Sequence, residues 1–155
     1  LRDVARFRRL YTWFHDNIPL SNDTSISDDN KVKKASLLSL IMCYYFRLAT
    51  SEQRRKYFQT IETDVKNLKQ VLPCQSLNEL LVLEKNALVK KMNLPPGVAM
   101  NRALTDNIFV LCICILNRIP VILCGKPGSS KTLSVQIVIS SFKGRFSKDP
   151  FLCTM

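Results

Sequence analysis

The sequence predicts an α/β chain that is mostly helical, with one strand, loop and helix near its C-terminal end. Two observations carry this expectation. Apolar residues recur at helical spacing through most of residues 2–117. A short apolar run at 120–124 then enters a loop of glycine, proline and serine, and a further apolar-periodic segment follows at 131–142.

Five segments ahead of that loop are expected to form helices. They cover residues 2–15, 31–49, 51–71, 76–92 and 99–117. The first would place five apolar side chains on one face: Val4, Phe7, Leu10, Tyr11 and Phe14. The strongest break in the chain, Asn93-Leu94-Pro95-Pro96-Gly97, is the expected internal boundary.

Two shorter segments need a choice between helix and strand. The run Leu80-Leu81-Val82-Leu83-Glu84 resembles a strand that ends in an acid, but its place in a helical pattern favours a core helix. Downstream, Gly144 could close the helix at 131–142, and a second strand is expected around 151–155.

Composition sets limits on the kind of protein. The 155 residues carry a net charge of +11 and 46% hydrophobic side chains, which is typical of a globular chain. The longest apolar run, 108–116, is too short for a membrane span. Because the first residue is Leu1 and not Met, we expect a piece of a longer protein.

The six cysteines include no CxxC pair, and His15 is the single histidine, so no zinc site is expected in this stretch. Cys112, Cys114 and Cys124 lie in apolar runs and are expected to be buried free thiols. Unpaired thiols fit a reducing, intracellular compartment.

The loop after the expected strand reads Gly125-Lys126-Pro127-Gly128-Ser129-Ser130-Lys131-Thr132, the layout of a Walker A phosphate-binding loop. Its two glycines allow a tight bend in which backbone N–H groups form an anion-binding nest. Lys131 would reach the outer phosphates of ATP, and the Thr132 hydroxyl would help to hold Mg²⁺. The alternative is an ordinary serine-rich turn.

One position departs from the Walker A pattern, because Ser130 stands where glycine usually precedes the lysine. A serine can occupy this position if its backbone lies in the right-handed helical region, where it also suits a helix start.

Carboxylates for hydrolysis are not expected in this chain. ATP hydrolysis needs acids that hold Mg²⁺ and position the attacking water. After Thr132 the sequence contains a single acid, Asp149. The chain is therefore expected to bind nucleotide weakly and to leave catalysis to residues elsewhere.

The best candidate for nucleic-acid binding is Arg54-Arg55-Lys56 beside Tyr57-Phe58. Charge blocks are weak evidence without a recognised module, and a solvated helix face explains this one equally well. Nucleic acid is therefore not an expected partner.

The Walker A loop, with its serine before the lysine, and the preceding segment 101–120 resemble the AAA+ core of the mysterin family, giant RING-finger E3 ubiquitin ligases with dynein-like ATPase units. The start at 1–7, the Trp13-Phe14 pair and the stretch 40–47 are similar to helical lid segments of such units. The resemblance covers nearly the whole chain and is loosest at about 50–90.

The resemblance implies a division of the chain. Residues 1–72 would be the helical lid of one AAA+ unit, 73–97 a helix and linker, and 98–155 the incomplete start of the next P-loop core. Arg2, and less so Arg6, would contact nucleotide held by the upstream unit; otherwise they solvate a helix face or pair with Asp3.

It also implies function and partners. The parent protein would be a cytoplasmic ATPase and ubiquitin transferase, with ATP and Mg²⁺ as cofactors and its zinc-binding RING outside this stretch. Its partners would be neighbouring AAA+ units and the ubiquitin-conjugating machinery. Two alternatives remain open: a non-hydrolysing nucleotide-binding or scaffold module, and a dynein-like AAA+ unit without ligase activity.

Overall fold

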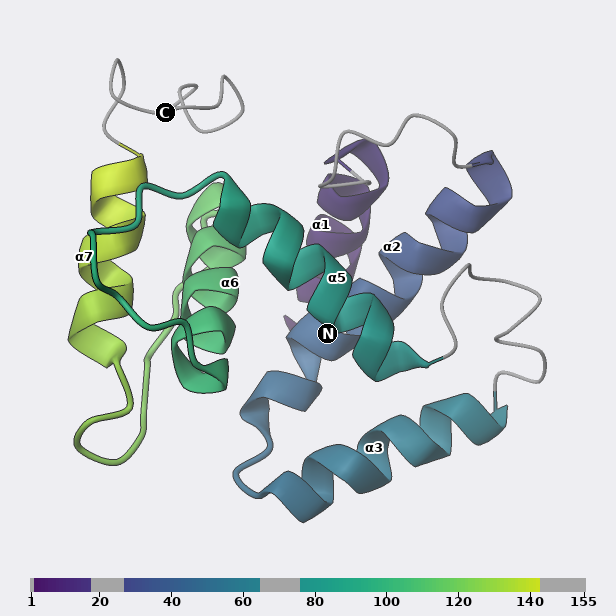
Figure 1. Ribbon diagram of the computed structural model, residues 1–155. Coiled ribbons are helices and arrows are strands. Elements are labelled where there is room, and N and C mark those ends of the chain that lie inside the picture. The colour runs from purple at the N-terminus through teal and green to yellow at the C-terminus, as the bar shows by residue number, and fades with distance from the viewer. Residues whose placement is uncertain (1, 18–26, 65–75, 143–155) are drawn as a thin grey trace. The chain divides into compact units, whose positions relative to one another are not determined.

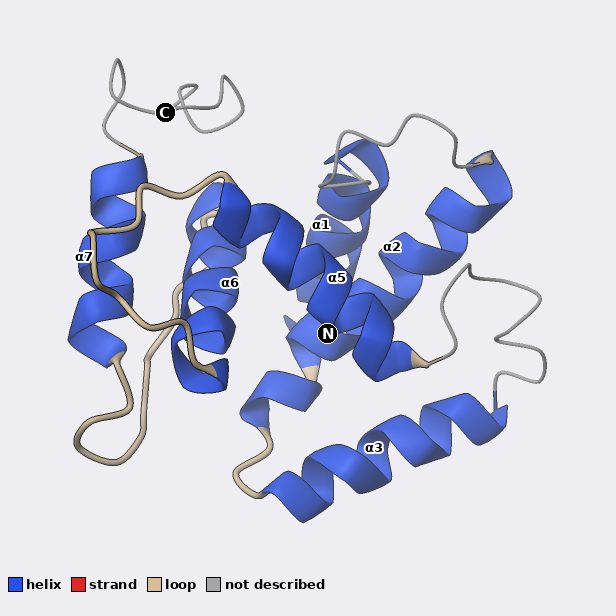
Figure 2. Ribbon diagram, in the orientation of Figure 1, coloured by secondary structure: helices blue, strands red, loops and turns tan. Residues whose placement is uncertain are grey.

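The computed structural model describes residues 2–17, 27–64 and 76–142 (Figure 1). Helices account for all the regular structure in these ranges (Figure 2). They are α1 (Arg2–Asn17), α2 (Asp28–Cys43), the short 3₁₀ helix η1 (Tyr45–Arg47), α3 (Ser51–Asp64), α5 (Leu77–Lys90), α6 (Arg102–Leu116) and α7 (Lys131–Ser141). The expectation of a mostly helical chain is confirmed.

The helix predictions are confirmed with shifted ends. The second predicted helix ends early, because Tyr44 leaves helical geometry at φ −125°; η1 follows at Tyr45–Arg47, and the backbone is extended at Leu48. The run 80–84 lies within α5, so it is helix as expected. The end of the third predicted helix, the helix end at Gly144 and the strand at 151–155 lie outside the described residues.

The prediction of a strand at 120–124 is wrong. These residues run as loop, and Ile122 is 87% exposed. A strand must exchange backbone hydrogen bonds with a neighbouring strand, and the described ranges offer none.

The chain divides into two compact units, residues 1–84 and 85–155, and the division falls within α5. In the first unit α1 packs against α2, with Leu10, Phe14, Leu38 and Ile41 completely buried. Val4, expected on the same apolar face, is instead 69% exposed, in the first turn of α1.

Aromatic stacking and a buried ion pair also hold the first unit. Tyr45 of η1 stacks on Phe58 of α3, with ring centroids 4.4 Å apart. The Lys34 ammonium lies 3.7 Å from the Glu84 carboxylate, and both side chains are buried. A charge with so little access to water needs such a partner.

In the second unit α6 packs along α7 (Figure 1). The buried side chains include Ile108, Phe109, Ile137 and Val138. Asn101 caps α6 by accepting a hydrogen bond from the Leu104 N–H at 2.9 Å. The predicted break at 93–97 forms part of the connection between α5 and α6.

Candidate phosphate-binding loop

The loop predicted to bind phosphate connects α6 to α7, and Lys131 is the first residue of α7 (Figure 1). A helix was expected to begin near Lys131, and this is confirmed. Residues 124–128 are exposed to solvent, and Ser129, Ser130 and Lys131 are partly buried. Thr132 is exposed in the first turn of α7, where the partial positive charge of the helix N-terminus is concentrated.

Two residues of the loop adopt left-handed backbone conformations. Gly128 has φ +78°, and Ser130 has φ +57° with ψ 23°. The right-handed geometry considered above for Ser130 is therefore wrong. The chain reverses immediately before α7, and this reversal is what demands a conformation that L-residues other than glycine rarely adopt. Left-handed residues of this kind form the concave backbone nests that bind anions.

The Lys131 side chain folds back into the loop. Its Nζ donates to the carbonyl oxygens of Gly125 and Lys126, at 2.8 Å each, and to Ser129 Oγ at 3.0 Å. Three loop positions therefore converge on one ammonium group. All three acceptors are neutral, so they satisfy the hydrogen bonds of the cation without cancelling its charge.

Ser129 closes the loop on itself. Its Oγ donates to the Lys126 carbonyl oxygen at 2.8 Å, and its N–H donates to the same oxygen at 3.3 Å. A Cβ on Gly125 would lie 2.9 Å from Ser129 Oγ, so the loop has room there only for glycine unless the serine moves. The compact turn thus depends on both residues.

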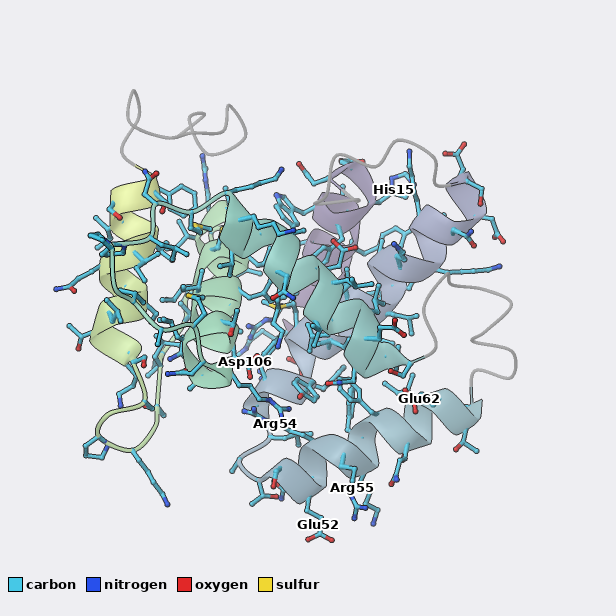
Figure 3. The ribbon with its side chains drawn as sticks, viewed as in Figure 1. His15, Glu52, Arg54, Arg55, Glu62 and Asp106 are labelled. Atoms are coloured by element: carbon cyan, nitrogen blue, oxygen red, sulfur yellow. The ribbon has the colours of Figure 1, made fainter. Side chains whose placement is uncertain are left out.

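Asn107 of α6 is a loop contact that the motif did not predict. Its Nδ2 donates to the Ser129 carbonyl oxygen at 2.9 Å, across 22 residues of sequence. The adjacent residue, Asp106, accepts a hydrogen bond from Lys85 Nζ at 2.6 Å, and both side chains of this pair are buried (Asp106 is labelled in Figure 3). The sequence carries no signal for the Asn107 contact beyond the expectation of a helix there.

The cysteines are only partly as predicted. Cys112 and Cys114 are buried, and burial raises the pKa of the Cys112 thiol well above its ordinary value. Cys124 is exposed, because the segment expected to be a buried strand is loop. Across 2–17, 27–64 and 76–142, no cluster of histidine, cysteine and acidic residues is arranged to hold a metal ion.

In the basic segment of α3, Arg54 and Tyr57 make packing contacts, whereas Arg55 and Lys56 are exposed. Arg54 Nε donates to the Leu48 carbonyl oxygen at 3.0 Å, and its guanidinium lies over the Tyr45 ring, 5.3 Å from the centroid. Tyr57 Oη donates to the Leu40 carbonyl oxygen at 3.1 Å, and burial raises the Tyr57 pKa to about 12. Figure 3 shows Arg55 on the outer side of α3, away from Arg54.

The arginines proposed to reach an upstream nucleotide lie on α1. Arg2 is exposed at the start of the helix, and Arg6 is partly buried. Asp3, considered above as their partner, instead pairs with Arg47, with Oδ1 and Nη1 3.2 Å apart. Within the described ranges, none of the helices combines the length and apolar character needed to span a membrane.

Comparison with known proteins indicates which family the chain resembles. Residues 97–155, which include the loop, match the family model described as the RNF213 AAA domain. The chain is 30% identical over 151 residues to E3 ubiquitin-protein ligase rnf213-beta of Danio rerio, which covers 95% of the chain and 3% of the relative. It is 28% identical over 156 residues to E3 ubiquitin-protein ligase RNF213 of Homo sapiens, with 93% and 3% covered.

E3 ubiquitin-protein ligase RNF213 of Mus musculus is similar as well, at 27% identity over 157 residues, with 94% of the chain and 3% of the relative covered. The chain thus spans about 3% of the length of the curated relatives that it matches. These findings confirm the resemblance to mysterin-type ligases, the family to which the RNF213 names refer. Nearly the whole chain is thus similar to a segment of RNF213-type ligases, and its residues 97–155 match the RNF213 AAA domain family.

Proposed function

We propose that residues 125–132 bind the triphosphate of ATP together with Mg²⁺, as part of an AAA module of a large E3 ubiquitin ligase. The position of the Lys131 ammonium carries the proposal, because it lies within the loop on the carbonyl oxygens of Gly125 and Lys126. Hydrogen bonds from a cation to an ionised acceptor are roughly twice as strong as those between neutral groups. Phosphate oxygens would therefore displace these carbonyls as the acceptors of Lys131.

The other residues of the loop would have distinct roles. The backbone N–H groups of the loop residues 125–131 other than Pro127 would surround the phosphates, with Gly128 and Ser130 supplying the left-handed turns. The exposed Thr132 hydroxyl fits a Mg²⁺ ligand, because oxygen is the donor that this ion prefers. Residues 120–142 contain no aspartate or glutamate, so the carboxylates that support hydrolysis would come from elsewhere in the protein.

The wider role rests on the relatives. Proteins named E3 ubiquitin-protein ligases match nearly the whole chain, which supports a parent protein that transfers ubiquitin with residues outside this segment. In that protein the segment would work beside further AAA+ units, zinc would be bound elsewhere, and the setting would be the cytoplasm. Arg2 would reach a phosphate of nucleotide held by the upstream unit, a role compatible with its exposure.

A scaffold without nucleotide is the second candidate. The same hydrogen bonds that place Lys131 in the loop also satisfy it internally. If these hydrogen bonds of Lys131 persist when ATP is added, the loop serves only to connect α6 and α7.

The test compares two lysines of the loop. Lys131→Ala removes the ammonium that lies inside the loop, whereas Lys126→Ala removes an equal charge from an exposed side chain. Loss of a charge-assisted phosphate contact should weaken Mg·ATP binding about tenfold to a hundredfold for Lys131→Ala, measured by equilibrium titration of the full chain. Lys126→Ala should change it less than about threefold, the scale of an exposed charge pair. Equal effects of the two substitutions would reject the proposal.

A further inference from the structure

Asn107 connects the phosphate-binding loop to the helix behind it. Its side-chain amide donates to the Ser129 carbonyl oxygen at 2.9 Å, and Asn107 itself is partly buried on α6. We infer that Asn107 is a positioning residue that sets the orientation of the Ser129–Ser130 peptide for phosphate binding. This inference rests on the proposed function, and it adds a residue outside the Walker A motif.

The geometry of a peptide bond explains what the contact does. A trans peptide is planar, and its C=O and N–H point in opposite directions. Holding the Ser129 carbonyl oxygen on Asn107 therefore turns the N–H of Ser130 away from α6. Ser130 is the N-cap of α7, so its N–H is among the donors that a bound anion can reach.

The contact acts next to the strained position. Ser130 has φ +57°, which costs free energy for a residue with a Cβ, and its side chain makes no capping hydrogen bond. Without other restraints the peptide before it would relax toward ordinary backbone angles. The free energy of the hydrogen bond from Asn107 is large enough to oppose that relaxation.

A buried ion pair holds the helix turn that carries Asn107. The neighbouring Asp106 is buried and accepts a hydrogen bond from Lys85 Nζ at 2.6 Å, which ties the first half of α6 to the second half of α5. Asn107 thus extends from a helix turn that is itself anchored. A side chain on an anchored helix can hold a loop more rigidly than one on another loop.

The test is a double-mutant cycle between Asn107→Ala and Ser130→Gly. Glycine adopts φ near +57° without steric cost, so it should need the Asn107 contact less. In the otherwise natural chain, Asn107→Ala should weaken Mg·ATP binding about fivefold to twentyfold. In the Ser130→Gly background the same substitution should weaken it less than about twofold.

A second readout needs no nucleotide. Amide hydrogen exchange at Ser129 and in the first turn of α7 should become about fivefold to tenfold faster with Asn107→Ala, and again less so beside Ser130→Gly. Thr105→Ala is the matched control, because it removes a side-chain hydrogen bond at the start of the same helix, to the Asn101 carbonyl oxygen and not to the loop. It should leave exchange in the loop unchanged.

The outcomes separate this inference from the proposed function. Equal effects of Asn107→Ala with serine and with glycine at position 130, or no effect on loop exchange, would overturn the inference even if Lys131→Ala abolishes ATP binding. Faster loop exchange that Ser130→Gly relieves would support the orienting role of Asn107 on the Ser129–Ser130 peptide, and an unchanged ATP affinity with Lys131→Ala would then reject only its link to phosphate binding.

Discussion

Two cations, Arg54 in the first unit and Lys131 in the second, show different uses of positive charge. Arg54 lies against the Tyr45 ring and donates to a backbone carbonyl oxygen within a packed group of helices. Lys131 donates to two carbonyl oxygens and one hydroxyl of a loop that is open to solvent. The first set of contacts includes an aromatic ring that phosphate cannot replace, whereas phosphate can replace every acceptor in the second.

The comparison shows how to separate a structural cation from a binding one. Charge alone does not do so, since the run Arg54-Arg55-Lys56 is more basic than the loop. What matters is whether the partners of the cation belong to a core or to an exposed turn with left-handed backbone. The first unit should therefore respond to substitution mainly in stability, and the loop of the second mainly in ligand binding.

The largest expected effect is in the first unit. Tyr45 is 1% exposed and stacks on Phe58, whereas the adjacent Tyr44 is 41% exposed. Tyr45→Ala should lower the free energy of unfolding by about 3–5 kcal/mol, and Tyr44→Ala by less than about 0.5 kcal/mol. Denaturant titration measures both. A similar cost for the two would mean that the Tyr45 stack does not hold this unit together.

The next effect concerns the anchor beneath the loop. Asp106→Leu leaves the Lys85 ammonium buried without its carboxylate, and should cost about 3 kcal/mol of stability. The double variant Lys85→Met with Asp106→Leu removes both charges and should lie within about 1 kcal/mol of the natural chain. Thermal unfolding at matched pH measures the stability of the single and the double variant. If the double variant were as unstable as Asp106→Leu, the cost would come from lost packing and not from an unpaired charge.

The smallest effect separates two neighbouring arginines of α3. Arg54→Ala removes the contact with Tyr45 and the hydrogen bond to Leu48, so it should cost about 1–2 kcal/mol of stability. Arg55→Ala, on the exposed side, should cost less than about 0.5 kcal/mol. Chemical denaturation followed by circular dichroism would show the difference. Nucleic-acid binding lost through Arg55→Ala alone would break the comparison, because α3 would then use its charge for a ligand.

Much of the helical structure could be predicted from apolar periodicity. The pattern identified the six α-helices of the described residues and placed the start of α7 near Lys131, because local spacing decides which face of a helix is buried. The Walker A order of residues likewise pointed to the loop before any contact was known.

Features that depend on distant residues could not be predicted in this way. The run 120–124 has the composition of a strand, but strand formation requires a partner, and composition does not supply one. The left-handed backbone of Ser130, the contact from Asn107 and the exposure of Cys124 all follow from how the chain enters α7. Periodicity carries no information about any of them.

The most direct measurement is a structure determined with Mg²⁺ and a non-hydrolysable ATP analogue. We expect Lys131 Nζ to leave the carbonyl oxygens of Gly125 and Lys126 and to lie at hydrogen-bond distance from the outer phosphates, with the loop N–H groups around them. A bound analogue elsewhere on the protein, with Lys131 still on its loop carbonyls at saturating ligand, would contradict it.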